Sequence, residues 1–160
     1  MALTKLNNQS LAAVTSAGIP IRTGSVLQVV QVENSTQVDT TTSAYVSTGL
    51  IATITPSATS SKILVCAQVN GVYKDGNNQS GVGIRLKRGS SEIKVLAIRA
   101  AGDSSDIQSV GTVGADILDS PNTTSATTYS IDMKATGNAA NAYVQVYGVT
   151  SSITLMEIAG

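Results

Sequence analysis

Two stretches of alternating residues between Leu50 and Tyr73 constrain the fold of this chain more than any other feature. In each stretch, every second residue is apolar and of a size suited to a core: first Leu50, Ala52 and Ile54, then Ile63, Val65, Ala67 and Val69. A period of two is typical of strands that bury one face. Pro56 lacks a backbone N–H and ends the first stretch, and residues 57–61 are Ser, Ala and Thr, as in a turn. We predict two strands joined by a short polar connection.

The same alternation recurs along most of the chain. Polar turn residues separate the runs, and a Thr-rich stretch, residues 36–43, precedes the run that contains Leu50. We predict a loop over Lys74–Gly81 and a hairpin that turns at Gly89-Ser90-Ser91. The predicted strands are Val26–Val32, Ala44–Thr55, Lys62–Tyr73, Val82–Lys87, Glu92–Ala100, Ile107–Val113, Ala115–Leu118, Thr127–Lys134, Tyr143–Tyr147 and Ile153–Ile158. Of these, Ile107–Val113 is weak because glycine interrupts it, and Ala115–Leu118 is only a short apolar piece. Eight or nine strands with almost no helix predict an all-β protein, an antiparallel β-sandwich of the jelly-roll type.

The first 24 residues differ from the rest. Asn7 or Asn8 is placed to cap one or two turns of helix, which Gly18 and Pro20 would stop. A helix this short is marginal in water, so we expect an arm that becomes ordered against a partner. We therefore predict an N-terminal anchoring arm over 1–24 and a β-sandwich domain over 25–160. The arm's partner-binding residues would be Leu3, Leu6, Leu11 and Val14.

The composition predicts an unusual core. The 160 residues include no Trp and no Phe, and five Tyr are the only aromatic residues. Val, Ile, Leu and Ala must fill the interior, and each buries less area than a large aromatic side chain would. We therefore expect oligomerisation to add stability.

Charge and targeting signals exclude several classes of partner. Ten basic residues balance ten acidic ones, which argues against nucleic-acid and membrane partners. We expect the local group Arg85, Lys87 and Arg88 to lie on a solvated strand face. The N-terminus lacks the apolar region of a signal peptide, and no apolar run is long enough to span a membrane, so we expect synthesis in the cytoplasm. Cys66 is the single cysteine, and we expect it to be a small buried side chain.

The residues that usually carry catalysis are scarce. The chain has no His, which removes the commonest general base and zinc ligand. Gly81-Val82-Gly83 lacks the third glycine of a dinucleotide-binding loop. The carboxylate pairs Asp103 with Asp106 and Asp116 with Asp119 lie in turn-like stretches, where aspartate is common for backbone reasons. We predict no catalytic, cofactor or metal site and no enzymatic activity.

Tyr143 and Tyr147 are predicted to share one face of a late strand. Such a pair could stack on a sugar, although packing at a sheet or subunit interface is more common.

Three short stretches carry a family resemblance. Ile21–Gln31 (IRTGSVLQVVQ), Ile54–Val65 (ITPSATSSKILV) and Ser152–Ile158 (SITLMEI) resemble small β modules in the virion structural proteins of tailed phages, especially phages of cyanobacteria and other marine hosts. The resemblance implies a non-enzymatic, usually trimeric module of a tail fibre or of the head surface. It defines no functional residues.

The resemblance and the residues together favour a virion protein that forms a homotrimer and decorates or cements the capsid, with its arm bound to the major capsid protein. One alternative is a tail-fibre or receptor-binding component whose loops, such as Lys74–Gly81, contact the host surface or its glycans. The other is a carbohydrate-binding or hydrolytic domain that uses Tyr143, Tyr147 or the aspartate pairs.

Overall fold

A computed structural model describes residues 22–75, 80–103, 110–137 and 141–160. Within these residues the chain forms strands and one short 3-10 turn. The bounds are β1 Val26–Asn34, β2 Val38–Thr40, β3 Val46–Ile54, β4 Lys62–Asp75, β5 Ser80–Arg88, β6 Ser91–Asp103, β7 Gly111–Asp119, β8 Thr127–Thr136, β9 Asn141–Val144, η2 Val146–Gly148 and β10 Ser151–Ile158.

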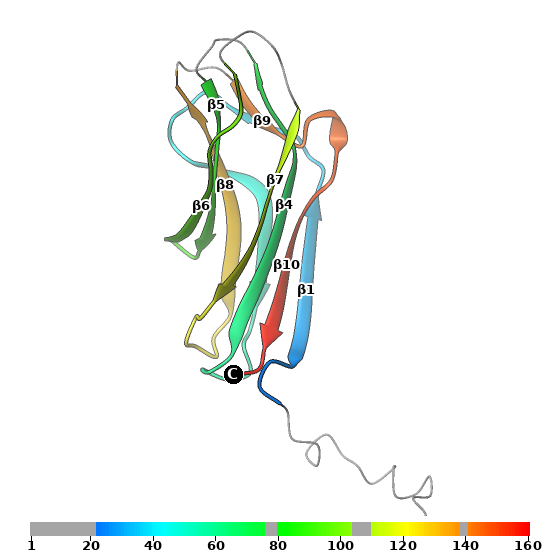
Figure 1. Cartoon of the computed structure of the whole chain (residues 1–160), viewed down its shortest axis with the longest axis vertical. Coiled ribbons are helices and arrows are strands. Elements are labelled where there is room, and N and C mark those ends of the chain that lie inside the picture. The colour runs from blue at the N-terminus through cyan, green and yellow to red at the C-terminus, as the bar shows by residue number, and fades with distance from the viewer. Residues whose placement is uncertain (1–21, 76–79, 104–109, 138–140) are drawn as a thin grey trace, which may run out of the picture.

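The strands form two antiparallel sheets that pack face to face (Figure 1). In one sheet β10 and β7 flank β4, and β1 pairs with β10; β9 and β2 extend this sheet along the upper part of β4. The other sheet has the order β3-β8-β5-β6. Most neighbours are distant in sequence, and the two orders, β1-β10-β4-β7 and β3-β8-β5-β6, are those of a jelly roll. The predicted all-β antiparallel sandwich is confirmed.

The core lies between the sheets and consists of the residues that the alternation selects. Leu50, Ile63 and Val65 are fully buried, as are the inner residues of β5, β8 and β10: Val82, Ile84, Leu86, Tyr129, Ile131, Met133, Ile153 and Leu155. Tyr129 is the one tyrosine within this core cluster of the described residues. The aliphatic side chains that composition led us to expect therefore fill most of the interior.

The two alternating stretches between Leu50 and Tyr73 lie in opposite sheets. β3 pairs with β8, whereas β4 pairs with β10, β7 and β9. The polar connection after Pro56 therefore crosses from one layer to the other. The predicted hairpin is confirmed, because β5 pairs with β6 through the turn at Gly89.

Three local predictions need correction. Residues 36–43 contain a short strand, β2, that pairs with β9. The apolar piece after Gly111 is one continuous strand, β7. The predicted loop Lys74–Gly81 is wrong at both ends, because Lys74 and Ser80 lie in strands and are buried. Residues 76–79 lie outside the described residues.

A β-bulge at Asn70 and Gly71 changes which face β4 buries. Below it, Val65, Ala67 and Val69 point inward, but above it Val72 and Lys74 are buried instead. The register with β7 shifts between Val69 and Val72, and Gly71 has a φ of 61°. One extra residue in a strand moves every later side chain to the opposite face. The bulge therefore places Tyr73 on the outer face, where simple alternation from Val69 would bury it.

A buried carboxylate ties the connection between the sheets to β1 and β10. Glu157, on β10, is 1% exposed and accepts hydrogen bonds at its Oε1 from the Ser57 N–H (2.7 Å) and hydroxyl (2.6 Å). Its Oε2 accepts a hydrogen bond from the Gln28 amide at 2.6 Å. Burial alone would raise the pKa of Glu157, but these donors outweigh burial and lower it to about 2.

We predict that Gly71→Ala lowers the free energy of unfolding by about 3 kcal/mol in urea denaturation. A Cβ at Gly71 would lie 2.7 Å from the Val146 nitrogen and 2.6 Å from a Val149 methyl carbon, so overpacking adds to the cost of the left-handed backbone. Gly89→Ala is the matched control, since Gly89 has a φ of 56° but no atom within 4 Å of an added Cβ; we expect a loss of about 1 kcal/mol. Equal losses in the two variants would contradict the packing role of Gly71.

We predict that Glu157 makes the fold sensitive to acid. The folded pKa is about 2 and the ordinary value is 4.5, so the carboxylate stabilises the fold fully above pH 4.5, and this contribution is lost as the pH falls from there toward 2. The loss amounts to up to about 3 kcal/mol. Glu157→Gln should remove this component of the pH dependence, whereas Glu33→Gln, at an exposed position of β1, should retain it. Identical pH profiles for wild type and Glu157→Gln would contradict the assignment.

Candidate assembly surface

The outer face of the sheet β1-β10-β4-β7 carries a row of apolar side chains across four strands. Val29 pairs with Met156, Met156 with Leu64, and Leu64 with Leu118, and paired residues of antiparallel strands project from the same face. Three strand spacings give the row a length of about 14 Å. Val29 is 56% exposed and Leu118 is 53% exposed. These four residues are called the apolar row below.

The apolar row lies toward the lower end of the sandwich, where the described chain begins and ends (Figure 1). Val26 and Ile158 pair just below it, and Val26 is 54% exposed. Backbone hydrogen bonds of 2.8 Å from Gly24 N–H to the Ala159 carbonyl and from Ala159 N–H to the Ser25 carbonyl fix residues 22–25 against this end. The predicted arm therefore joins the sandwich beside the apolar row.

A polar row follows above the apolar row. Its members, paired in order across the four strands, are Gln31, Thr154, Cys66 and Asp116. Cys66, Gln68, Asp116 and Thr154 contribute to a shallow depression of about 230 Å³. Burial and the neighbouring Asp116 raise the pKa of the Cys66 thiol to about 11, so the thiol stays protonated at neutral pH. The prediction that Cys66 lies in the core is wrong, because this residue is on the outer face and partly exposed.

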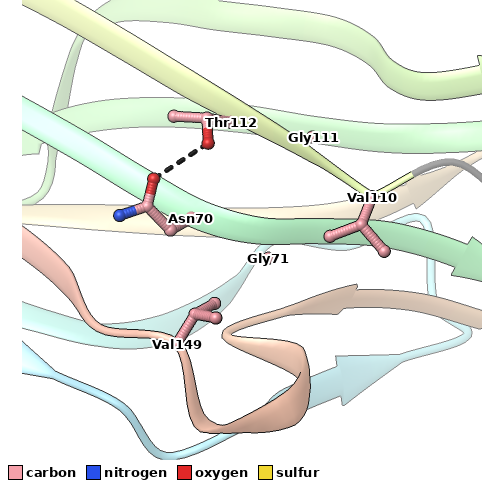
Figure 2. Close-up of a pocket in the computed structure, with 6 residues that line it drawn as sticks. All are labelled: Asn70, Gly71, Val110, Gly111, Thr112 and Val149. Carbon is pink, nitrogen blue, oxygen red and sulfur yellow. Dashed lines mark hydrogen bonds between the residues drawn. The ribbon is translucent and has the colours of Figure 1, made fainter.

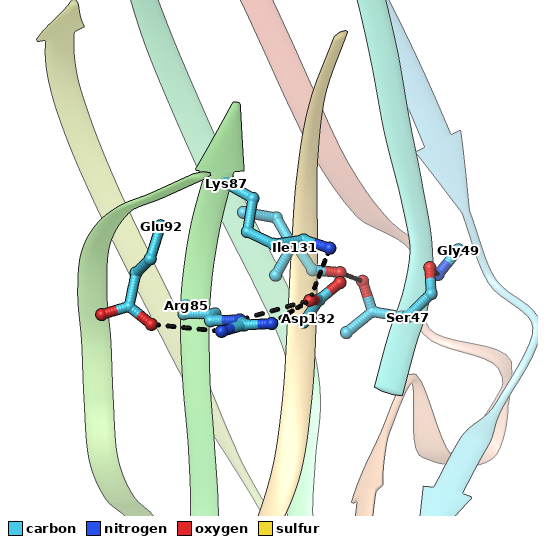
Figure 3. A network of polar contacts seen from close by, with 8 residues as sticks. Ser47, Gly49, Arg85, Lys87, Glu92, Ile131 and Asp132 are labelled. Carbon is cyan, nitrogen blue, oxygen red and sulfur yellow. Dashed lines mark hydrogen bonds and ion pairs between the residues drawn. The ribbon is translucent and has the colours of Figure 1, made fainter. Parts of the chain in front are cut away.

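The basic group of β5 is paired with acids and is not simply solvated. Asp132, on β8, is 4% exposed and binds Arg85 at 3.0 Å and Lys87 at 2.9 Å (Figure 3). Arg85 also pairs with Glu92 at 3.3 Å and stacks on the ring of Tyr45, 3.9 Å from its centroid. Two cations compensate the buried carboxylate. This network belongs to the outer face of the second sheet and ties β8 to β5 and β6.

Of the two aspartate pairs, Asp116 and Asp119 do not come together as a pair. Asp116 and Asp119 both lie in β7, not in a turn, and point to opposite faces. Asp119 accepts hydrogen bonds of 2.7 Å from Arg88 and from the hydroxyl of Tyr129, which links β7 to the other sheet. Asp103 ends β6, and Asp106 lies outside the described residues. Among the residues that the structure describes, no three His, Cys, Asp or Glu are grouped to hold a metal ion.

Tyr143 and Tyr147 do not share a strand face. β9 ends at Val144, and Tyr147 lies in η2 with a φ of 60°. Tyr143 pairs instead with Tyr73 of β4, and their ring centroids are 5.4 Å apart. Sequence reasoning missed Tyr73 because the bulge that turns it outward has no signal in the alternation.

Leu3, Leu6, Leu11 and Val14, the residues predicted to bind a partner, lie outside the described residues. The helix within the arm, the role of these four residues and the division of the chain at residue 24 stay predictions. In the described part of the chain, no helix is long and apolar enough to cross a membrane.

No family model and no curated protein matches the chain. Among solved structures, the chain is similar to the VP2 subviral particle of infectious bursal disease virus, with a TM-score of 0.42 and 12% identity over 83% of this chain and 33% of that one. It is also similar to structures of the Gx strain (TM-score 0.42, 13% identity, 83% and 32% covered) and the Gt strain (TM-score 0.41, 10% identity, 83% and 38% covered) of the same virus. The chain thus spans about a third of the length of these structures.

Proposed function

We propose that the chain is a non-enzymatic structural protein of a tailed-phage virion, a homotrimer that decorates and cements the outer surface of the head. The observation that carries this proposal is the apolar row. Val29 and Leu118 are more than half exposed in the single chain, and contiguous exposed apolar residues commonly mark interaction sites. Contact with a second copy of the chain would remove them from water and add the stability that an aliphatic core lacks.

The arrangement of the outer face suits an interface between copies. An interface of standard size buries about 800 Å² on each partner, with an apolar centre and a polar rim. The apolar row with Val26 and Ile158 would form the centre, and the polar row from Gln31 to Asp116 would lie in the rim. Asp116 is the only charged member of these two rows, and Lys62, which pairs with Ile158, adds one cation at the edge of the centre. The four residues of the apolar row themselves bring no charge that would have to be desolvated.

The three stretches that resemble phage virion modules lie side by side in the fold. Residues 22–31 enter β1, Ile54–Val65 connects β3 to β4, and Ser152–Ile158 forms most of β10. β10 pairs with β1 on one side and with β4 on the other, and the Glu157 hydrogen bonds join all three stretches. The resemblance therefore covers one contiguous unit, which supports the virion role.

The arm would attach this unit to the head. Residues 22–25 lie beside the apolar row, and we assign Leu3, Leu6, Leu11 and Val14 to contacts with the major capsid protein. The absence of His from the sequence is consistent with a role without catalysis.

A tail-fibre or receptor-binding role is the second candidate. The observation that favours it is the group formed by Tyr73, Tyr143 and Tyr147 at the upper end of the sandwich, opposite the end where the described chain begins (Figure 1). A module anchored at its lower end would present these tyrosines to the outside.

We predict that Leu118→Lys converts the trimer to a monomer. Wild type should have about three times the mass of one 16.3 kDa chain in light scattering after gel filtration. Burying an unpaired ammonium costs at least about 2 kcal/mol at each interface. Ile98→Lys is the control, because Ile98 is 76% exposed on β6 of the other sheet and this variant should stay trimeric. A monomeric wild type, or a trimeric Leu118→Lys variant, would contradict the interface.

We predict that removal of residues 1–20 releases the protein from virions without dissociating the trimer. The deletion takes away the four residues assigned to the capsid contact but leaves β1 and the apolar row intact. The amount that co-sediments with purified particles should fall at least about tenfold, as expected when roughly 1.4 kcal/mol or more of binding free energy is lost. Undiminished incorporation would refute the anchoring role.

A further inference from the structure

Three of the five tyrosines gather at the upper end of the sandwich. Asp39, Tyr143 and Tyr73 form one row across β2, β9 and β4, and the rings of Tyr73 and Tyr143 are in contact. Tyr147 lies in η2, three residues beyond the end of β9, and the Gln145 N–H that precedes η2 is hydrogen-bonded to the Asn70 carbonyl of β4. Burial, the Asp75 charge and the phenols of Tyr147 and Tyr143 raise the pKa of Tyr73. Tyr73, Tyr143 and Tyr147 are together called the tyrosine platform below.

The backbone holds Tyr147 in an unfavourable conformation that exposes its ring. Gln145 and Tyr147 have φ angles of 57° and 60°, and the left-handed region costs a side chain other than glycine roughly 1–2 kcal/mol. Tyr147 is nevertheless 83% exposed, so burial of its ring does not offset this cost. Strained residues that the surrounding structure holds in place are frequent at ligand-binding sites.

Hydrogen bonds from β4 and β3 hold η2 and its flanks in place. The Gln145 N–H donates to the Asn70 carbonyl at 2.9 Å, and the Asn70 side chain donates to the Thr150 carbonyl at 2.7 Å. Gln145 is fully buried and donates to the Thr48 carbonyl at 3.3 Å. Because Gly71 has no side chain, Val146 and Val149 can lie directly against β4. The backbone that carries Tyr147 is therefore held in place.

An open pocket lies at the bulge of β4, and its lining includes none of the three tyrosines. It has a volume of about 520 Å³ and lies over β4 between β7 and the segment that follows η2 (Figure 2). Asn70, Gly71, Thr112 and Val149 line it, and the Thr112 hydroxyl donates to Asn70 Oδ1 at 2.9 Å. Gly71 precedes Tyr73 by two residues on the same face of β4, which is roughly 7 Å along a strand. Apolar walls with a few fixed polar groups are typical of small-molecule sites.

We propose that the tyrosine platform and this pocket bind a neutral oligosaccharide. The C–H face of a pyranose ring packs on an aromatic ring while its hydroxyls bind amides, hydroxyls and carboxylates. Tyr147 and Tyr143 would stack on the sugar, and Asn70 and Thr112 would bind its hydroxyls. The exposed carboxylates beside the platform on these strands are Asp39 and Asp75. Of the two lysines of β4, Lys62 lies at the opposite end of the strand and Lys74 is buried toward the interior, so a neutral sugar is favoured over an acidic one. This inference does not depend on the virion role.

The test uses tyrosine fluorescence and saturation-transfer NMR on the full chain, which contains no Trp. The probes are maltohexaose, mannohexaose and chitohexaose, with a hyaluronan hexasaccharide as the acidic comparison, each up to roughly 10 mM. We expect at least one neutral probe to bind and the acidic probe to bind more weakly. Tyr143→Ala and Tyr147→Ala should weaken binding at least tenfold, whereas Tyr45→Ala, on the opposite sheet, should leave it unchanged.

Tyr147→Gly separates binding from folding. Glycine adopts a φ of 60° without strain, so this variant should melt at or above the wild-type temperature and yet lose binding. The proposal is overturned if no neutral probe binds, if only the acidic probe binds, or if binding persists in Tyr147→Gly. It also fails if the tyrosine substitutions change the mass of the oligomer, since the platform would then be a subunit interface.

Discussion

The β-bulge at Asn70 and Gly71 is the constraint on which the rest of this structure depends. β4 is the longest strand of the described chain, and both candidate surfaces lie on its outer face. Below the bulge this face presents Leu64 and Cys66, and above it Tyr73. The bulge also leaves room at Gly71 for the segment around η2. A single change of register thus gives one strand an apolar assembly surface at one end and an aromatic platform at the other.

Three acidic residues connect strands of the described chain through hydrogen bonds and ion pairs. Glu157 joins β10 to β1 and to the connection between the sheets. Asp119 joins β7 to β5 and β8, and Asp132 holds two cations of β5. Each carboxylate is largely buried and hydrogen-bonded, which avoids the cost of an unpaired buried charge. On the outer face of the β4 sheet, the apolar row itself carries no charge, and it therefore suits contact with another protein surface.

The sequence predicted the strands and the core well, since alternation with a period of two directly reports a half-buried strand. It failed where the chain departs from that period. Tyr73 and Lys74 exchange faces at the bulge, and Tyr147 leaves β9 through left-handed residues. The prediction that Cys66 is buried is wrong because it followed the residue type. The alternation buries Val65 and Ala67 and therefore puts Cys66 on the outer face. The apolar row could not be foreseen, because it depends on which strands are neighbours, and strand order is not encoded in periodicity.

The role that we propose for this sandwich is that of a structural component of a virion head. The copy number of the chain relative to the major capsid protein, measured by quantitative mass spectrometry of purified particles, tests it most directly. A protein that decorates the head through trimeric contacts should be present in numbers comparable with the capsid protein. A few copies per particle would instead place the chain on the tail and favour receptor binding, and its absence from particles would contradict the virion role altogether.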